Sequence, residues 1–220
     1  MALAIFDLDN TLINGDSDHS WGEFLLARKL VDEQAYRHQN DQFYQDYQSA
    51  SLDIDAYLRF ALQPLTQYSP SDLAQLHKDF MREYIEPIML PKAKQLLTEH
   101  RERGDYLLII TATNGFITRP IAAHLEVDEI LATDPELKNG RYTGGYLGTP
   151  CFGAGKVTNL KLWLDKHNQD LDGSYFYSDS INDLPLLEQV PHPVAVNPDA
   201  RLAAVARERN WPILDLHEQP

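Results

Sequence analysis

Cysteine is nearly absent from this chain, since Cys151 is the single cysteine among 220 residues. An intramolecular disulfide is therefore impossible, and a structural zinc site built from several cysteines is excluded. Long apolar runs are also missing, so we expect no membrane-spanning segment. The N-terminus has no basic stretch of the kind that precedes a secretory signal, and we therefore expect a cytoplasmic protein.

Basic residues are scarce relative to acidic ones. The chain has 19 lysines and arginines against 33 aspartates and glutamates, which gives a formal net charge of -14. Such a surface repels phosphate backbones, which argues against nucleic acid as the main partner. We expect a small-molecule partner, neither nucleic acid nor membrane, and the sequence does not indicate an oligomeric state. A small anionic substrate would need a local positive centre, which a cation held among carboxylates provides.

Two kinds of sequence pattern alternate along the chain. Residues 17–86 are polar and rich in tyrosine, with apolar residues at helical spacing. The remainder alternates short apolar strands, such as 106–110, with helices, which favours a Rossmann-like parallel α/β sheet. The helical block interrupts this alternation after the first strand and is therefore expected to form an inserted, all-helical cap. The expected domains are a core of residues 1–15 plus 87–220 and a cap of residues 16–86.

The first strand ends in two acids, Asp7 and Asp9. In an extended strand residues i and i+2 point to the same side, so the two carboxylates share one side of the strand end. Their repulsion would push one toward protonation, and a divalent cation removes that cost. The pair therefore indicates a metal site with one acid free for nucleophilic or proton-transfer work. The alternative is an ordinary turn or cap, whereas an EF-hand loop does not fit because Leu12 stands where that loop needs glycine.

Other polar side chains follow the later strands. In open parallel sheets ligands bind at the carboxyl ends of the strands, where Thr111 and Asp179 are expected. Asp7 and Asp179 could supply two magnesium ligands from neighbouring strands, and Thr111 offers a hydroxyl donor to a phosphoryl oxygen. Lys156 offers a positive charge near the start of a helix. Each of these residues also has an ordinary structural alternative, such as a helix N-cap or an exposed lysine.

The ordered set of motifs resembles the haloacid dehalogenase superfamily of phosphatases. Its four motifs are Asp7-Leu8-Asp9-Asn10-Thr11, Thr111 after an apolar strand, Lys156, and Ser178-Asp179-Ser180-Ile181-Asn182-Asp183. The resemblance covers most of the chain, and the helical block after the first motif is similar to the cap of the phosphoserine-phosphatase-like branch. A P-loop is a poor alternative for Lys156, because Pro150 and Val157 stand where that motif needs Gly and Ser or Thr.

The resemblance implies roles for individual residues. Asp7 is the implied nucleophile, and Asp9 is the implied acid that protonates the leaving alcohol and then activates water. The implied cofactor is Mg²⁺, held by Asp7, the Asp9 backbone carbonyl and Asp179. Thr111 and the Ala112 N–H are implied to bind the phosphate. Asp183 is implied to orient either the metal's water shell or Lys156, and Asn182 is implied to support the metal ligands from behind.

The residues after the first motif give the evidence about the substrate. Asp16 stands where phosphoserine phosphatases carry an acid, usually Glu, for the substrate amine, and Arg59 is a candidate for binding a substrate carboxylate. The acid-rich Gly15-Asp16-Ser17-Asp18-His19 looks more like relatives that act on histidinol phosphate, which has an amine and an imidazole but no carboxylate. An acidic rim suits a cationic amino alcohol.

We therefore expect a magnesium-dependent phosphomonoesterase of a small amino-alcohol or amino-acid phosphate. The reaction is expected to pass through an aspartyl-phosphate, and histidinol phosphate ranks ahead of phosphoserine by a small margin. Two alternatives stay open. One is a phosphotransferase or phosphomutase of the same fold, and the other is a non-catalytic acidic metal-binding module.

Overall fold

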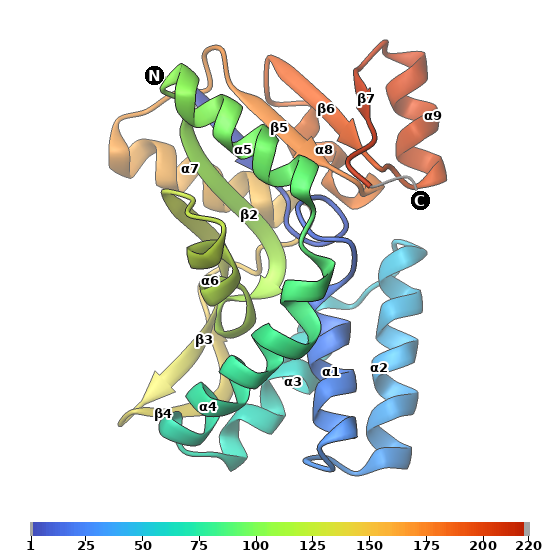
Figure 1. The fold of residues 1–220 in the computed structure, drawn as a ribbon, viewed down its shortest axis with the longest axis vertical. Coiled ribbons are helices and arrows are strands. Elements are labelled where there is room, and N and C mark those ends of the chain that lie inside the picture. The colour runs from blue at the N-terminus through green and yellow to red at the C-terminus, as the bar shows by residue number, and fades with distance from the viewer. Residues whose placement is uncertain (1, 218–220) are drawn as a thin grey trace.

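The computed structural model describes residues 2–217 and contains one seven-stranded sheet (Figure 1). The strand order is β4-β3-β2-β1-β5-β6-β7, and every neighbouring pair is parallel except the antiparallel β3–β4 pair. The predicted parallel α/β sheet is therefore confirmed. The strands are β1 (Leu3–Phe6), β2 (Tyr106–Asn114), β3 (Glu129–Lys138), β4 (Arg141–Leu147), β5 (Tyr175–Ser178), β6 (His192–Val196) and β7 (Ile213–Leu214).

The two faces of the sheet are covered by different helices. Within β1, Leu3 and Ile5 belong to one buried apolar cluster, while Ala4 and Phe6 belong to the other, as the two-residue repeat of a strand requires. Both sets are fully buried, which explains why this strand is a continuous apolar run. One cluster includes α5 (Pro91–Arg103) and α6 (Gly115–His124), and the other includes α7 (Ala154–His167), α8 (Leu184–Leu187) and α9 (Ala200–Glu208).

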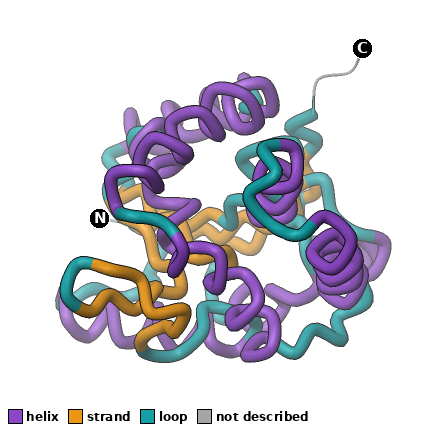
Figure 2. Tube along the Cα trace, turned by 90° about the horizontal axis from the view of Figure 1, so that it is seen from below, coloured by secondary structure: helices purple, strands orange, loops and turns teal. Residues whose placement is uncertain are grey.

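Four helices lie between β1 and α5 and fall within the segment expected to form the cap. Figure 2, which looks at the molecule from below, shows helices in front of the strands. Each helix begins at a side chain that accepts a backbone N–H from the first turn, namely Asp16, Asp32, Asp53 and Ser69. The helices are α1 (Ser17–Ala27), α2 (Glu33–Gln48), α3 (Ile54–Leu62) and α4 (Pro70–Phe80), followed by a π-helical turn at Met81–Ile85.

The end of α2 rests on the core. Asn182 donates from Nδ2 to the Tyr47 carbonyl at 3.1 Å. Arg201 donates to the carbonyls of Gln48 at 2.6 Å and Ser49 at 3.2 Å. These side chains add donors to carbonyls at the C-terminal end of the helix, where partners within the helix run out. The end of α2 is thereby held against core residues that follow β5 and begin α9.

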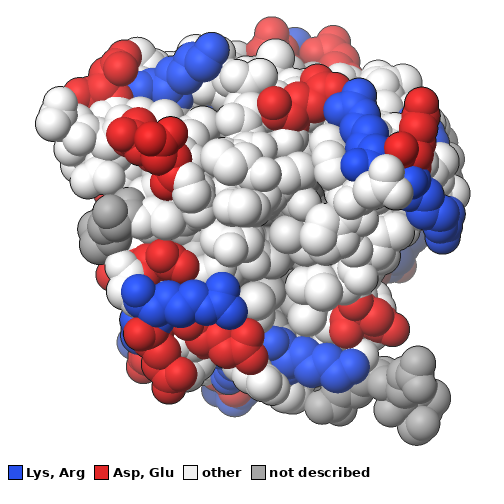
Figure 3. All heavy atoms as spheres, turned by 90° about the horizontal axis from the view of Figure 1, so that it is seen from above, with Lys and Arg blue, Asp and Glu red and all other residues white. Residues whose placement is uncertain are grey.

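The opposite end of the molecule has a different surface. Figure 3 views it from above and shows acidic and basic side chains interleaved around an uncharged centre. Over residues 2–217 we find no helix with the length and apolar character that crossing a bilayer requires.

Candidate active site

The site begins where β1 ends, in the middle of the sheet. β1 lies between β2 and β5, so the residues that follow these three strands meet at one edge. The Asp7 N–H donates to the Tyr177 carbonyl at 2.8 Å, which extends the strand pairing to the first acid. Asn10 then adopts a positive φ of 55° and turns the chain away. This geometry places Asp7 next to the residues that follow β5.

Lys156 joins two of the predicted acids. Its Nζ lies 2.6 Å from Asp7 Oδ1 and 2.7 Å from Asp183 Oδ2, and its side chain is fully buried in the first turn of α7. Burial lowers the pKa of Lys156, but the two carboxylates outweigh it and raise this pKa above its usual value. Ser178 also donates from Oγ to Asp183 Oδ2 at 2.7 Å. The lysine is therefore a fixed positive charge beside Asp7, oriented by Asp183.

Asp179 belongs to the same cluster, but no hydrogen bond joins it to Lys156. Burial raises its pKa well above the usual value, and the charges of Asp7 and Asp183 raise it further. Thr11 Oγ1 approaches one carboxylate oxygen at 3.5 Å. Three carboxylates thus surround one ammonium group, which leaves an excess of negative charge in a buried place. Such an oxygen-rich set fits a hard divalent cation such as Mg²⁺, and Asp7 and Asp179 are the side chains that would hold it.

Asp9 is held by donors on both carboxylate oxygens. The Ser17 N–H donates to Oδ1 at 2.6 Å, and Thr113 donates from Oγ1 to Oδ2 at 2.8 Å. Burial and the nearby Asp16 raise the pKa of Asp9 to about 7, against the lowering effect of Ser17 and Thr113. A carboxyl group with a pKa near neutrality can give and take a proton, as an acid–base group must.

Thr113 contacts the site, and the sequence analysis gave it no role. It stands two residues after Thr111 on β2, and that spacing on a strand could have identified it. Thr111 is also buried, and its Oγ1 accepts the Thr113 N–H at 3.1 Å. The Thr111 hydroxyl proton is then left to donate to a phosphoryl oxygen. Thr111 and Ala112 both line the pocket above Asp7.

The pocket lies between the core and the cap. Its core wall consists of Asp7, Asp9 and residues 111–113, and its cap wall includes Asp16, Asp18, Phe43, Tyr44, Tyr47 and Tyr57. The structure therefore brings the predicted Asp16 and Ala112 to the same cavity as the acids that follow β1.

Asp16 has two tasks at this wall. As the N-cap of α1 it accepts the N–H groups of Asp18 at 3.0 Å and His19 at 2.8 Å, both on Oδ1. Oδ2 is left for a ligand, and burial raises the pKa of the group. A short side chain suits the N-cap position, which accounts for Asp where the resembling branch usually has Glu.

Two predicted residues lie elsewhere. Arg59 is exposed on α3 and lines a separate groove with Tyr36 and Phe60, so the structure does not bring it to the pocket. Asn182 faces the cap instead of the acids, because its Nδ2 bonds the Tyr47 carbonyl. Tyr47, a cap residue that was not predicted, lines the pocket together with Asp7, and burial raises its pKa well above the usual value.

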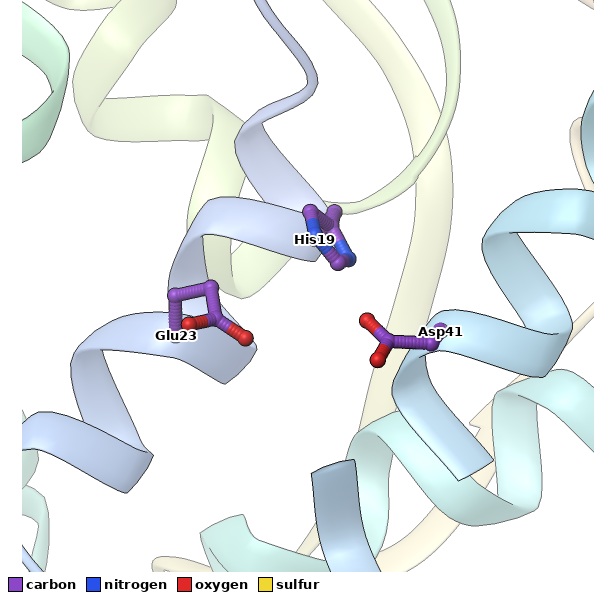
Figure 4. Close-up of side chains that lie close together, drawn as sticks. All are labelled: His19, Glu23 and Asp41. Carbon is purple, nitrogen blue, oxygen red and sulfur yellow. The ribbon is translucent and has the colours of Figure 1, made fainter. Parts of the chain in front are cut away.

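A second cluster of ionisable groups lies on the cap. Figure 4 shows His19 and Glu23 of α1 facing Asp41 of α2, and their donor atoms lie within 4.8 Å of one another. Arg37 already pairs with Glu23 at 3.1 Å, and Asn40 contacts His19 Nδ1 at 2.9 Å. These contacts fix the His19 ring at the wall of the pocket.

Comparisons with known proteins agree with this geometry. The model of the haloacid dehalogenase-like hydrolases matches residues 4–188. A protein of Neisseria meningitidis serogroup C named histidinol-phosphatase is 49% identical over 97% of this chain and 98% of its own length. A phosphoserine phosphatase of Mycobacterium tuberculosis is 33% identical over 97% of this chain and 70% of its own length. A crystal structure of a protein of unknown function from Bordetella pertussis superposes with a TM-score of 0.92 at 41% identity, covering 98% of this chain and 99% of the other.

Proposed function

The chain belongs to the haloacid dehalogenase-like hydrolases and is a phosphatase, and from this premise we propose that it is a magnesium-dependent histidinol-phosphate phosphatase. The proposal concerns the substrate, the cofactor and the reaction path. It rests on the walls of the pocket above Asp7.

The carrying observation is the charge of the cap wall. Asp16 and Asp18 place two carboxylates in the pocket, and no arginine or lysine from residues 2–217 lines it with them. Carboxylates attract a substrate amine and repel a substrate carboxylate. Histidinol phosphate has an amine and no carboxylate, whereas the carboxylate of phosphoserine would find no cation on this wall. The name of the Neisseria relative supports the same choice.

The reaction follows from the positions of the two acids after β1. A carboxylate oxygen of Asp7 attacks phosphorus, the ester P–O bond breaks, and Asp9 gives its proton to the leaving alkoxide. The product of this step is an aspartyl-phosphate. Asp9, now deprotonated, takes a proton from a water molecule that attacks phosphorus. The bond between Asp7 and phosphorus then breaks, and inorganic phosphate leaves.

Fixed positive charge and donors stabilise the transferring group. Lys156, bonded to Asp7 and Asp183, stays beside the nucleophile throughout. The Thr111 hydroxyl and the Ala112 N–H are the donors to the phosphoryl oxygens. Magnesium, when held by Asp7, Asp179 and the Asp9 carbonyl, supplies positive charge that reduces repulsion between phosphate and nucleophile.

Phosphoserine is the second candidate substrate, because the relative from Mycobacterium tuberculosis is named for it and Asp16 would serve either amine. The test is turnover of histidinol phosphate, phosphoserine and a sugar phosphate by the purified protein with magnesium. We expect kcat/KM for histidinol phosphate to exceed that for phosphoserine by about 10-fold or more and that for the sugar phosphate by about 100-fold. Equal turnover of the sugar phosphate contradicts the recognition of an amine.

A control separates hydrolysis from phosphoryl transfer. Released inorganic phosphate should equal the alcohol product, both with and without an added acceptor alcohol. A deficit of free phosphate in the presence of the acceptor would instead indicate a phosphotransferase. Chelation of magnesium by EDTA should abolish turnover, and excess magnesium should restore it.

A further inference from the structure

The cap wall of the pocket contains a carboxylate that the proposed reaction does not use. Asp18 lies in the first turn of α1, is 7% exposed and lines the pocket. Its Oδ2 is buried without a hydrogen-bond partner from residues 2–217. A buried carboxylate oxygen without a donor is costly, so a donor from the ligand would complete this group.

Asp16 and Asp18 are neighbouring acids of the cap wall. Asp16 is the N-cap of α1 and Asp18 lies in the first turn of that helix, and both line the pocket together with Asp7 and Asp9. Burial raises the pKa of Asp18, and the charges of Asp16 and Asp9 raise it further.

Aromatic rings line the same pocket as Asp18. Phe43 and Tyr57 both line the pocket, with ring centroids 5.4 Å apart at an angle of 69°. The Tyr57 hydroxyl lies close enough to Asp18 to lower the pKa of that carboxyl. Aromatic faces beside a carboxylate favour a flat, positively charged ring that can donate an N–H.

We propose that Asp18 binds the imidazole ring of the substrate through an N–H of that ring, while Asp16 binds the amine. The assignment rests on the proposed function, because histidinol phosphate carries both groups beyond its phosphate. It makes Asp18 the residue that selects the imidazole-bearing substrate from other amino-alcohol phosphates. It also gives the unpartnered Oδ2 the donor that the protein does not supply.

The test compares Asp18→Asn with the unmodified protein on three substrates. Histidinol phosphate is compared with phenylalaninol phosphate, which keeps the amine and a flat ring but lacks the ring N–H, and with 2-aminopropyl phosphate, which lacks the ring. A site built for an N–H donor should prefer histidinol phosphate over phenylalaninol phosphate by about 100-fold or more. In Asp18→Asn this ratio should fall by about 10-fold or more, and kcat/KM should fall more for histidinol phosphate than for 2-aminopropyl phosphate.

Asp16→Asn and Asp18→Glu sharpen the comparison. Asp16→Asn should lower turnover of all three amines and leave the ratio between histidinol and phenylalaninol phosphates in place. Asp18→Glu keeps the charge and should retain more of that ratio than Asp18→Asn. Calorimetry of histidinol and phenylalaninol binding to the unmodified protein tests the preference without any variant, and about 10-fold tighter binding of histidinol is expected.

Separate outcomes identify which assignment fails. A normal preference for histidinol phosphate that Asp18→Asn leaves unchanged overturns the role of Asp18 alone. An equal loss on all three substrates also overturns it, since that result indicates a structural role. Absence of any preference for histidinol phosphate over phosphoserine in the unmodified protein overturns the proposed function and this assignment together.

Discussion

Two groups of buried acids lie where the core and the cap meet, and they are balanced in different ways. Asp7, Asp179 and Asp183 form the core group, in which Lys156 donates to Asp7 and Asp183. Asp16 and Asp18 form the cap pair, whose donors are the backbone N–H groups that bind Asp16 and the Tyr57 hydroxyl near Asp18. The core thus carries part of its own positive charge, whatever the substrate. The cap pair leaves the positive charge to the ligand, which assigns chemistry to the core and selection to the cap.

The most severe test of this division is Asp7→Asn. Removing the proposed nucleophile should lower kcat by about 10⁴-fold or more on every substrate, including p-nitrophenyl phosphate, because the proposed chemistry depends on the core alone. The measurement is phosphate release with the folded state checked by circular dichroism. Asp165→Asn, an exposed acid on α7, is the matched control and should retain full activity. A loss confined to histidinol phosphate would place Asp7 in selection and break the comparison.

The charge balance of the core group is tested by Lys156→Met. Without the ammonium group, buried carboxylates lose their partner, and the free energy of unfolding should fall by about 3–5 kcal/mol at pH 8. Burial already raises the pKa of Asp7, and loss of Lys156 raises it further. At pH 5 these carboxyls are therefore more protonated, and the deficit should be smaller.

The measurement is urea unfolding at both pH values. Lys161→Met on the exposed face of α7 is the control and should change stability by less than about 0.5 kcal/mol. A deficit that is equal at pH 5 and pH 8 would indicate lost packing of the lysine chain instead of lost charge.

The cap pair should respond in the opposite direction. Burial raises the pKa of Asp18 from 3.8 to about 8. Ionisation of this group therefore opposes folding: the stability contribution is complete below pH 3.8 and is lost as the pH rises through about 8. Asp18→Asn removes that cost, and the ligand-free variant should gain about 1–3 kcal/mol at pH 9 after allowance for rehydration.

Thermal unfolding between pH 5 and pH 9 checks this prediction, and the gain should shrink toward pH 5. Glu33→Gln is a matched control, because it is an acid in the first turn of a cap helix that lies exposed. A destabilised Asp18→Asn at pH 9 would mean that a partner inside the protein already satisfies this carboxylate. We expect Asp18→Asn to be more stable and less selective, because residues that serve binding often reduce the stability of the protein.

Local signals explain how much of the fold could be predicted. Pro91 suits the first turn of a helix and Gly104 suits its end, and α5 is observed as Pro91–Arg103, with Gly104 at a φ of 81°. β2 continues past the expected 106–110 to Asn114. The apolar run ends at Ile110, but the β-branched threonines that follow it also suit a strand.

The site could be predicted where the order of residues along the chain determines it, but not where the packing of the cap against the core determines it. Asp7, Thr111, Lys156 and the acids after β5 follow strands or start helices, so a parallel sheet brings them to one edge. The bond from Asn182 to the Tyr47 carbonyl joins residues 135 positions apart and depends on how the cap lies on the core. No local pattern encodes that contact, and the same limit explains why Arg59 was considered for the pocket.

The smallest expected effect concerns how the cap is held on the core. Arg201 is exposed and donates to the Gln48 and Ser49 carbonyls at the end of α2, so Arg201→Ala should weaken the closed arrangement by about 0.5–1 kcal/mol. Selection needs the cap wall, whereas the core chemistry does not. KM for histidinol phosphate should rise about 2–5-fold, with little change for p-nitrophenyl phosphate. Arg209→Ala removes another exposed arginine, whose partner Glu188 belongs to the core and not to the cap. This variant should leave KM for both substrates unchanged. Equal effects of the two variants on both substrates would mean that closure of the cap does not contribute to selection.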